Sequence, residues 1–394
     1  MKAVILAAGK STRMHPFTLK KPKALLPIVD KTLIQRSLES LKGTADEVII
    51  IVGHLKEQII GHLGKDFEGI KIKYVEQAEQ KGTGHALLQV KKEIKGKFIV
   101  INGDDLYSPK DIQACAKHEL CALAKAVKDP EKWGIFVIEN GFLKVVEEKP
   151  SKPKSDLANT GLWVLNEKIF PFLEKTTPSV RGEIELTSAI NEFCKKNKMP
   201  VEKVRDYWLP IGYPWHLLEA NVFFLQKESQ SSKEGVIEEN VTVKGLLVVG
   251  SGTVIKSGTY IEGPVWIGRD CIIGPCAYLR PDTIILDKVR TRAEIADSVL
   301  MNGVTAKHIS YIAHSIIGEN CNIAAGTITA DYRHDGKNNV TLINGVKVDS
   351  GRRKLGAFIG DNVNTGINTG IYPGRKIWPN RTTLPGEIVT KDIL

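Results

Sequence analysis

A six-residue repeat in the second half of the chain is the pattern that restricts the possible folds most. From residue 237 to residue 285 every sixth position is aliphatic, namely Ile237, Val243, Val249, Ile255, Ile261, Ile267, Ile273, Leu279 and Ile285. This period is typical of a parallel β-helix, in which each hexad supplies one strand and one turn and its aliphatic side chain points into the coil. The alternative is a β-sandwich with coincident spacing, which nine consecutive matches disfavour.

The repeat weakens twice before the end of the chain. It fails at about 286–316 and again at 330–358, and returns imperfectly through Ile359, Thr365, Ile371, Ile377, Thr383 and Val389. The second gap is polar, basic and glycine-containing, so we expect it to leave the coil as a loop. Loops that project from a rigid scaffold often carry function.

The chain before residue 230 has a different pattern. Short apolar runs at Val4–Ala8, Val48–Val52 and Phe98–Ile101 alternate with helix-like stretches such as Ile34–Leu41 and Gly84–Glu93. This alternation predicts an α/β domain with a mostly parallel sheet and helices on both faces. A polar, serine-rich stretch at 227–235 reads as a linker. The predicted domains are therefore 1–226 and 236–394.

Composition narrows the class of protein. The 394 residues include no apolar run long enough to cross a membrane, and the apolar stretch at the N-terminus is too short for a secretory signal, so we expect a cytoplasmic protein. The net charge of +10 fits either nucleic acid or anionic metabolites, and the spread of the basic residues favours phosphorylated metabolites and no nucleic acid. The six cysteines form no CxxC pair and are expected to be free thiols.

A glycine turn follows the first apolar run, in the sequence Ala8-Gly9-Lys10-Ser11-Thr12-Arg13. Such a turn after a parallel strand offers backbone N–H groups to a phosphate. It is not a Walker A loop, because Val4 stands where that motif needs glycine. Lysines at 20, 21 and 23 follow within the next ten residues and strengthen the prediction of phosphate binding.

The whole stretch LAAGKSTRMHPFTLKKPKALLPI resembles the signature of the sugar-phosphate nucleotidyltransferases, LAAGxGTRxxPxTxxxPKxLxPI, with Ser11 in place of a glycine. The resemblance implies a Rossmann-like fold and the transfer of a nucleotidyl group to a sugar 1-phosphate. It makes Leu6, Ala8 and Gly9 substrate-binding positions. It also implies that Arg13 neutralises the leaving phosphates and that Lys23 holds the incoming sugar phosphate.

Other motifs follow in the order of that family. The resemblance implies that Gln77, Gly82 and Thr83 read the base of UTP, although dTTP stays open, and that Asp104 in Asn102-Gly103-Asp104 ligates Mg²⁺. The motifs that resemble its sugar-binding contacts contain Trp133, Gly134, Glu148, Lys149, Asn159, Thr160 and Gly161. One position departs from the family: Pro210 stands where many members have an Asp that also contacts Mg²⁺, which puts uridylyl transfer in doubt.

The hexad region resembles the left-handed parallel β-helix of the hexapeptide acyltransferases, and in particular the acetyltransferase half of the bifunctional UDP-N-acetylglucosamine pyrophosphorylases. The segment from Lys307 to Thr329 follows the family's GHLxYxGDxxIGxxxNIGAGTIT. By this resemblance His308 is the general base of acetyl transfer from acetyl-CoA. The positions that match sugar-phosphate or acetyl-transfer contacts are Arg280, Tyr311, Asn322 and Lys337, with Ala325 at the acetyl-CoA site.

Here too the sequence departs from its relatives. Ala296 replaces a phosphate-binding lysine, and Asp331 replaces an asparagine. We expect a bifunctional enzyme that acetylates glucosamine 1-phosphate and then forms a UDP-N-acetyl sugar, as a homotrimer. A protein that keeps one of the two activities, and a non-catalytic sugar-nucleotide sensor or scaffold, are the alternatives. The sequence leaves open which amino sugar is acetylated.

Overall fold

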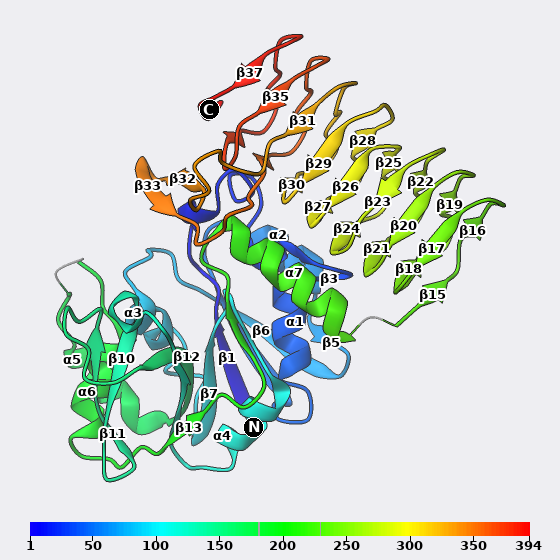
Figure 1. The fold of residues 1–394 in the computed structure, drawn as a ribbon. Coiled ribbons are helices and arrows are strands. Elements are labelled where there is room, and N and C mark those ends of the chain that lie inside the picture. Colours follow the sequence, from blue (N-terminus) through cyan, green and yellow to red (C-terminus); the bar gives the residue numbers. More distant parts are fainter. Residues whose placement is uncertain (180–181, 229) are drawn as a thin grey trace. The chain divides into compact units, whose positions relative to one another are not determined.

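The computed structural model describes residues 1–179, 182–228 and 230–394 (Figure 1). Its contacts divide the chain into two compact units. The first comprises residues 1–10 and 33–210, and the second comprises residues 11–32 and 211–394. Within the described ranges, no helix combines the length and the apolar character that a membrane crossing requires.

These units differ from the domains drawn along the sequence. Residues 11–32 and helix α7 (Pro214–Glu228) precede the predicted linker but belong to the second unit. Within the linker, residue 229 lies outside the described residues, and β15 (Ser232–Lys233) already pairs with the β-helix. The domain boundaries at 226 and 236 remain predictions from the sequence pattern. The compact units differ from those domains because they depend on contacts between segments that are far apart in the sequence.

A mixed sheet forms the centre of the first unit, with the strand order β11-β10-β12-β7-β1-β4-β6-β5. Its parallel part is β1 (Lys2–Leu6), β4 (Glu47–Val52), β6 (Ile70–Glu76) and β7 (Lys97–Asn102). The other strands are β5 (Asp66–Phe67), β9 (Cys121–Ala126), β10 (Gly134–Glu139), β11 (Phe142–Glu148), β12 (Leu157–Asn166) and β13 (Val201–Lys203). A separate pair joins β8 (Asp105–Tyr107) to β14 (Trp208–Pro210).

The helices of this unit are short. They are α1 (Leu33–Ser40), α2 (Lys56–Leu63), α3 (Thr83–Leu88), α4 (Pro109–Ala116), α5 (Phe170–Lys175) and α6 (Leu186–Cys194), with 3₁₀ turns η3 (Pro130–Lys132) and η4 (Glu167–Ile169). Residues 48–51 of β4 are fully buried, as expected for a parallel strand covered on both faces. The parallel α/β core predicted from the apolar runs is confirmed. All six cysteines are free, and four of them are buried.

The second unit is a left-handed parallel β-helix built from three sheets. The first sheet contains β15, β18 (Leu247–Val249), β21 (Val265–Ile267), β24 (Thr283–Ile285), β27 (Ser298–Leu300), β30 (Ile316–Ile317), β34 (Phe358–Ile359) and β36 (Lys376–Ile377). The second contains β16 (Val236–Ile237), β19 (Val254–Ile255), β22 (Ile272–Ile273), β25 (Arg290–Thr291) and β28 (Thr305–Ala306). The third contains β17 (Thr242–Lys244), β20 (Tyr260–Glu262), β23 (Tyr278–Leu279), β26 (Glu294–Ala296), β29 (Tyr311–Ala313), β31 (Ile328–Thr329), β35 (Gly370–Ile371) and β37 (Ile388–Val389).

The nine hexad residues occupy nine successive strands, β16 to β24, and pack in one interior cluster. The coil also continues through 286–316, where Thr291, Ile295, Leu300 and Ala306 fill the interior at uneven spacing. The second gap behaves as predicted and leaves the coil. It contains the hairpin β32 (Val340–Ile343) and β33 (Val346–Asp349), while β30 pairs directly with β34.

Candidate active sites

In the first unit, the loop after β7 places Asp104 at the carboxyl end of the parallel sheet. The N–H of Gly103 donates to the carbonyl of Leu6 at 2.9 Å, and a Cβ at Gly103 would lie 2.8 Å from that same oxygen. Glycine is therefore required where this loop crosses the end of β1. The contact brings the Asn102-Gly103-Asp104 motif beside the start of the Ala8-Gly9 turn.

The two neighbouring aspartates have different surroundings. Asp105 is 7% exposed and accepts hydrogen bonds from Asn102 Nδ2 at 3.2 Å and from the Tyr107 hydroxyl at 3.3 Å. Asp104 is half-buried. Pro210 lies opposite Asp105 in the β14–β8 pair, and its ring offers no ligand atom.

The donor set at this place tests whether Mg²⁺ fits. Across the described part of the chain, no group of three or more His, Cys, Asp or Glu side chains is arranged to hold a metal ion. Mg²⁺ at nucleotide sites is commonly held by one or two carboxylates together with substrate phosphates and water. One accessible carboxylate at Asp104 fits that mode of binding and does not fit an all-protein cage.

The predicted base-reading residues form one tight turn. The buried side chain of Gln77 donates from Nε2 to the carbonyl of Gly82 at 3.1 Å. Gly82 has a φ of +101°, and a Cβ there would lie 2.6 Å from the carbonyl oxygen of Ile184. The Thr83 hydroxyl accepts from the Leu186 N–H at 3.1 Å. Gln77 thus fixes the turn that presents Gly82 and Thr83.

The three predicted sugar-binding motifs also meet. Gly134 is paired with Glu148 between β10 and β11, and the N–H of Lys149 donates to the carbonyl of Trp133 at 3.0 Å. Asn159 Oδ1 accepts from the Gly161 N–H at 2.8 Å.

Gly161 joins these motifs to the β7 loop. Its φ is +79°, and a Cβ there would overlap Asn102 Nδ2. These motifs and the β7 loop lie between residues 102 and 161, and they converge because β11, β10, β12 and β7 are neighbours in the sheet.

Arg13 and Lys23 belong to the second unit, within segment 11–32. They lie on two 3₁₀ turns, η1 (Thr12–Met14) and η2 (Lys23–Leu25). The Arg13 guanidinium lies 5.3 Å from the centroid of the Tyr213 ring, so a cation–π contact orients it. The Tyr213 contact was not foreseen from the sequence.

On the β-helix, two predicted sugar-phosphate residues, Arg280 and Tyr311, lie at the third sheet, on either side of β26. Arg280 follows β23, and its Nη1 donates to Glu294 Oε1 on β26 at 3.0 Å. Tyr311 on β29 is the ladder neighbour of Glu294. Burial raises the pKa of the Tyr311 hydroxyl, and the nearby Asp331 carboxylate raises it further. The structure therefore brings Arg280, Tyr311 and Asp331 together.

The other predicted acetyl-transfer residues lie around one corner of the prism. His308 is exposed on the turn from β28 to β29, and Ala325 stands beside Gly326, whose N–H donates to the carbonyl of Ile309 in that turn. Asn322 lies on the face of β28, where it accepts from the Thr305 hydroxyl at 3.1 Å. Lys337 is exposed in the excursion 330–357.

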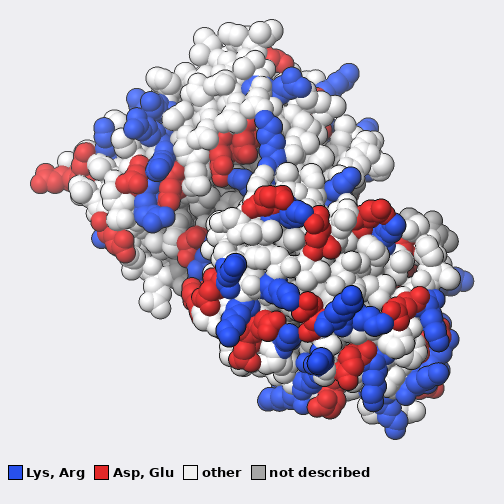
Figure 2. All heavy atoms as spheres, turned by 180° about the vertical axis from the view of Figure 1, so that it is seen from behind, with Lys and Arg blue, Asp and Glu red and all other residues white. Residues whose placement is uncertain are grey.

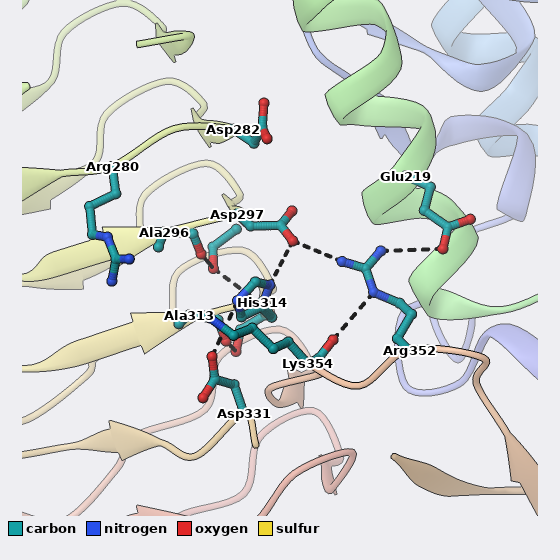
Figure 3. Close-up of polar contacts among 12 residues, drawn as sticks. Glu219, Arg280, Asp282, Ala296, Asp297, Ala313, His314, Asp331, Arg352 and Lys354 are labelled. Atoms are coloured by element: carbon teal, nitrogen blue, oxygen red, sulfur yellow. Dashed lines mark hydrogen bonds and ion pairs between the residues drawn. The ribbon is translucent and has the colours of Figure 1, made fainter. Parts of the chain in front are cut away.

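A partly buried charge network joins the excursion to the corners of the third sheet and to α7 (Figure 3). His314 Nδ1 is 2.6 Å from Asp297 Oδ2, and its Nε2 is 3.2 Å from Asp331 Oδ2. That Asp331 oxygen is buried and has no aligned hydrogen-bond donor among the described residues. Arg352 from the excursion donates to Asp297 at 2.8 Å and to Glu219 of α7 at 3.2 Å.

Sequence reasoning missed Asp297, His314, Arg352 and Glu219. Asp282, Asp297 and His314 all have positive φ, and the hydrogen bonds Asp297 N–H to Pro281 and His314 N–H to Ala296 stack these corners one above another. They are 15 and 17 residues apart, which is one coil. Asp282, Asp297 and His314 therefore repeat at the length of one coil and not at the six-residue spacing of the aliphatic positions.

The face of the molecule in Figure 2 carries no large patch of only Lys and Arg side chains. Lys and Arg side chains there are interspersed with Asp and Glu. This arrangement does not offer the continuous positive track that a nucleic-acid backbone requires.

Comparisons with known proteins agree with both halves of the molecule. Residues 2–227 match the nucleotidyl transferase family, and residues 247–281 match the bacterial transferase hexapeptide repeat. The chain is 39% identical to the bifunctional protein GlmU of Methanocaldococcus jannaschii, over 100% of this chain and 96% of the relative. It is also 39% identical to a bifunctional sugar-1-phosphate nucleotidylyltransferase/acetyltransferase of Sulfurisphaera tokodaii, over 100% and 98%.

Among solved structures, a UDP-glucose pyrophosphorylase complexed with UDP-glucose matches 58% of this chain and 99% of its own, with 27% identity and a TM-score of 0.53. The resemblance to nucleotidyltransferases and hexapeptide acyltransferases is therefore confirmed over the full length. The chain belongs to the family of bifunctional sugar-1-phosphate nucleotidylyltransferase/acetyltransferases.

Proposed function

We propose that this enzyme catalyses two successive steps of UDP-N-acetylglucosamine synthesis. The first is N-acetylation of glucosamine 1-phosphate by acetyl-CoA, and the second is uridylyl transfer from UTP to N-acetylglucosamine 1-phosphate. The observation that carries the proposal is the full-length likeness to bifunctional relatives, combined with the matches to a nucleotidyl transferase family and to the hexapeptide repeat in one chain.

In the uridylyl step, a phosphate oxygen of the sugar 1-phosphate attacks the α-phosphorus of UTP in line, and pyrophosphate leaves. Positioning and charge neutralisation dominate such a reaction. Arg13 neutralises the leaving phosphates, Lys23 holds the incoming phosphate, and the turn fixed by Gln77 binds the base. Asp104 would hold Mg²⁺ together with the substrate phosphates, and the ion would supply additional positive charge there.

In the acetyl step, the amine nitrogen attacks the thioester carbonyl of acetyl-CoA and the coenzyme A thiolate leaves. The amine must lose a proton, and His308 is the base that accepts it. Arg280 binds the sugar phosphate beside Tyr311. Lys337 and Asn322 complete the acceptor site, and Ala325 lies at the acetyl-CoA site.

A homotrimer completes this second site. The exposed apolar side chains near the His308 corner are Ile309, Ile328, Ile367, Leu384 and Ile388, each at least half exposed. Such a row on a β-helix favours contact with another copy. A neighbouring subunit can then contribute side chains to the exposed surface around His308.

A second candidate is a protein that keeps acetyl transfer alone or uridylyl transfer alone. Pro210 at the metal site and Ala296 at the phosphate site favour it. Two assays separate these functions: UTP, Mg²⁺ and N-acetylglucosamine 1-phosphate in one, and acetyl-CoA with glucosamine 1-phosphate in the other. We expect product in both. Turnover in neither assay refutes the proposal and favours a binding protein.

A further inference from the structure

Segment 11–32 carries Arg13 and Lys23 but is packed against the β-helix. Lys21 Nζ lies 2.6 Å from Glu319 Oε1, on the turn after β30. Asn344, in the hairpin turn of the excursion, donates from Nδ2 to the Thr12 hydroxyl at 3.1 Å. These contacts join residues about three hundred positions apart in the sequence.

Glu319, the β-helix partner of this ion pair, is held in place by its own hydrogen bond. The N–H of Glu319 donates to Asp361 Oδ1 at 2.8 Å. Burial raises the pKa of the Asp361 carboxyl, and the charge of Lys21 opposes that rise. Lys21 therefore approaches two carboxylates held on neighbouring coils.

Aromatic contacts supply the apolar part of this packing. The rings of Phe17 and Phe358 meet edge to face at 6.3 Å, and both side chains are buried. His15 and Trp378 meet in the same manner at 6.4 Å. Pairs of this kind are favourable beyond the apolar area that they bury.

Helix α7 holds the other end of the segment. The fully buried side chain of Asn221 accepts from the Val29 N–H at 2.7 Å and donates to the carbonyl of Pro27 at 2.9 Å. Contacts at residues 12, 15, 17 and 21 and at 27 and 29 thus flank Arg13 and Lys23 on both sides.

We propose that the β-helix holds segment 11–32 in the conformation that presents Arg13 and Lys23 to phosphates. Glu319 acts as a positioning residue through Lys21. The inference rests on the proposed nucleotidyl function. Phosphate binding by flexible side chains is weaker when their backbone must be ordered at the same time, so a prefixed segment favours turnover.

Charge reversal in the full-length chain tests this role. Glu319→Lys and Lys21→Glu each place like charges together, and we expect each to lower kcat/KM for uridylyl transfer by about tenfold while acetyl transfer stays within about twofold. The double variant Lys21→Glu/Glu319→Lys restores the attraction, and we expect it to recover most of the loss. Glu262→Lys is the matched control, since the carboxylate of Glu262 accepts from Tyr278 on the same β-helix and not from segment 11–32.

Hydrogen exchange gives a readout that does not depend on activity. In Glu319→Lys, amides of residues 12–26 should exchange faster than in the unmodified protein, while those of β1 stay unchanged. Unchanged exchange in this segment, equal loss of both activities, or no recovery in the double variant overturns the inference. Absence of uridylyl transfer in the unmodified protein refutes the proposed function instead, and exchange still decides whether Glu319 holds the segment.

Discussion

At the scale of single residues, the two proposed reactions depend on different side chains. Asp104 follows β7 in the first unit, and His308 lies on a turn of the β-helix in the second. Their substrates do not share a reacting atom, because one reaction occurs at phosphorus and the other at the amine.

The two activities should therefore be lost separately. His308→Ala should lower kcat for acetyl transfer by at least about a hundredfold, the usual contribution of a general base, and leave uridylyl transfer nearly unchanged. Asp104→Ala should do the reverse. Steady-state rates in the two assays measure both effects. Wild-type acetyl transfer by His308→Ala would show that another group accepts the proton.

Pro210 should weaken the hold on Mg²⁺. It lies opposite Asp105 in the β14–β8 pair, where an aspartate would add a carboxylate to that of Asp104, and Asp105 is itself bonded to Asn102 and Tyr107. We expect an unusually high Mg²⁺ requirement, and Pro210→Asp should lower the half-saturating concentration severalfold and raise kcat. Mg²⁺ titration of the initial rate measures this.

Pro210→Ala and Pro210→Asn are the controls, because any substitution here also restores a backbone N–H and frees φ. Equal improvement by Ala and Asp would mean that the defect is conformational. Saturation of the unmodified enzyme at ordinary Mg²⁺ concentrations would mean that a further group supports the ion.

At the scale of structural elements, the excursion covers a charged side chain of β36 that is costly to bury. Lys376 on β36 is 2% exposed, and its Nζ donates to the carbonyl of Leu342 in the excursion at 2.6 Å. Burial lowers the pKa of the Lys376 ammonium to about 8, although Asp392 opposes the shift.

Replacing Lys376 by Met should stabilise the fold at pH 7, by about 1–3 kcal/mol in the free energy of unfolding, because the protonated amine is disfavoured when buried. Between pH 8 and about 10.4 the unfolded chain binds more protons at this side chain than the folded chain, so this residue makes the unmodified protein more stable as pH rises. The advantage of the variant should shrink above pH 8 and vanish near pH 10.5. Urea unfolding at pH 7 and pH 10 measures it, and a destabilised variant at pH 7 would show that the bond to Leu342 outweighs the burial.

The elements differ in how far the sequence predicts them. The coil from 237 to 285 can be predicted because its interior residues repeat every six positions. Its continuation through 286–316 could not be predicted, because Thr291 and Ala306 fill the interior in place of larger aliphatic residues and some coils are shortened.

The sites show the same limit. Motifs predict Asp104, Gln77 and Tyr311, because each lies within a short sequence pattern. The contacts of Glu319 with Lys21 and of Arg352 with Glu219 join residues that are far apart in sequence, so no local pattern reveals them.

At the scale of the whole molecule, assembly should control one reaction and not the other. We expect a trimer in light scattering. The double variant Leu384→Glu/Ile388→Glu places charges in the exposed apolar row and should yield monomers that lose acetyl transfer and keep uridylyl transfer. Val236→Glu, at an exposed position on the first coil, is the matched control. A fully active monomer would contradict a shared acetyl-transfer site.

The excursion at 330–357 leaves the coil after β31, and β34 then takes its place directly on β30. The scaffold is thus continuous above and below an insertion that contributes Asp331, Lys337 and Arg352. Substitutions at exposed positions such as Lys337 can therefore change the chemistry of this insertion and leave the stack of coils unbroken, whereas a change at Leu342 or Asn344 also reaches β36 or segment 11–32.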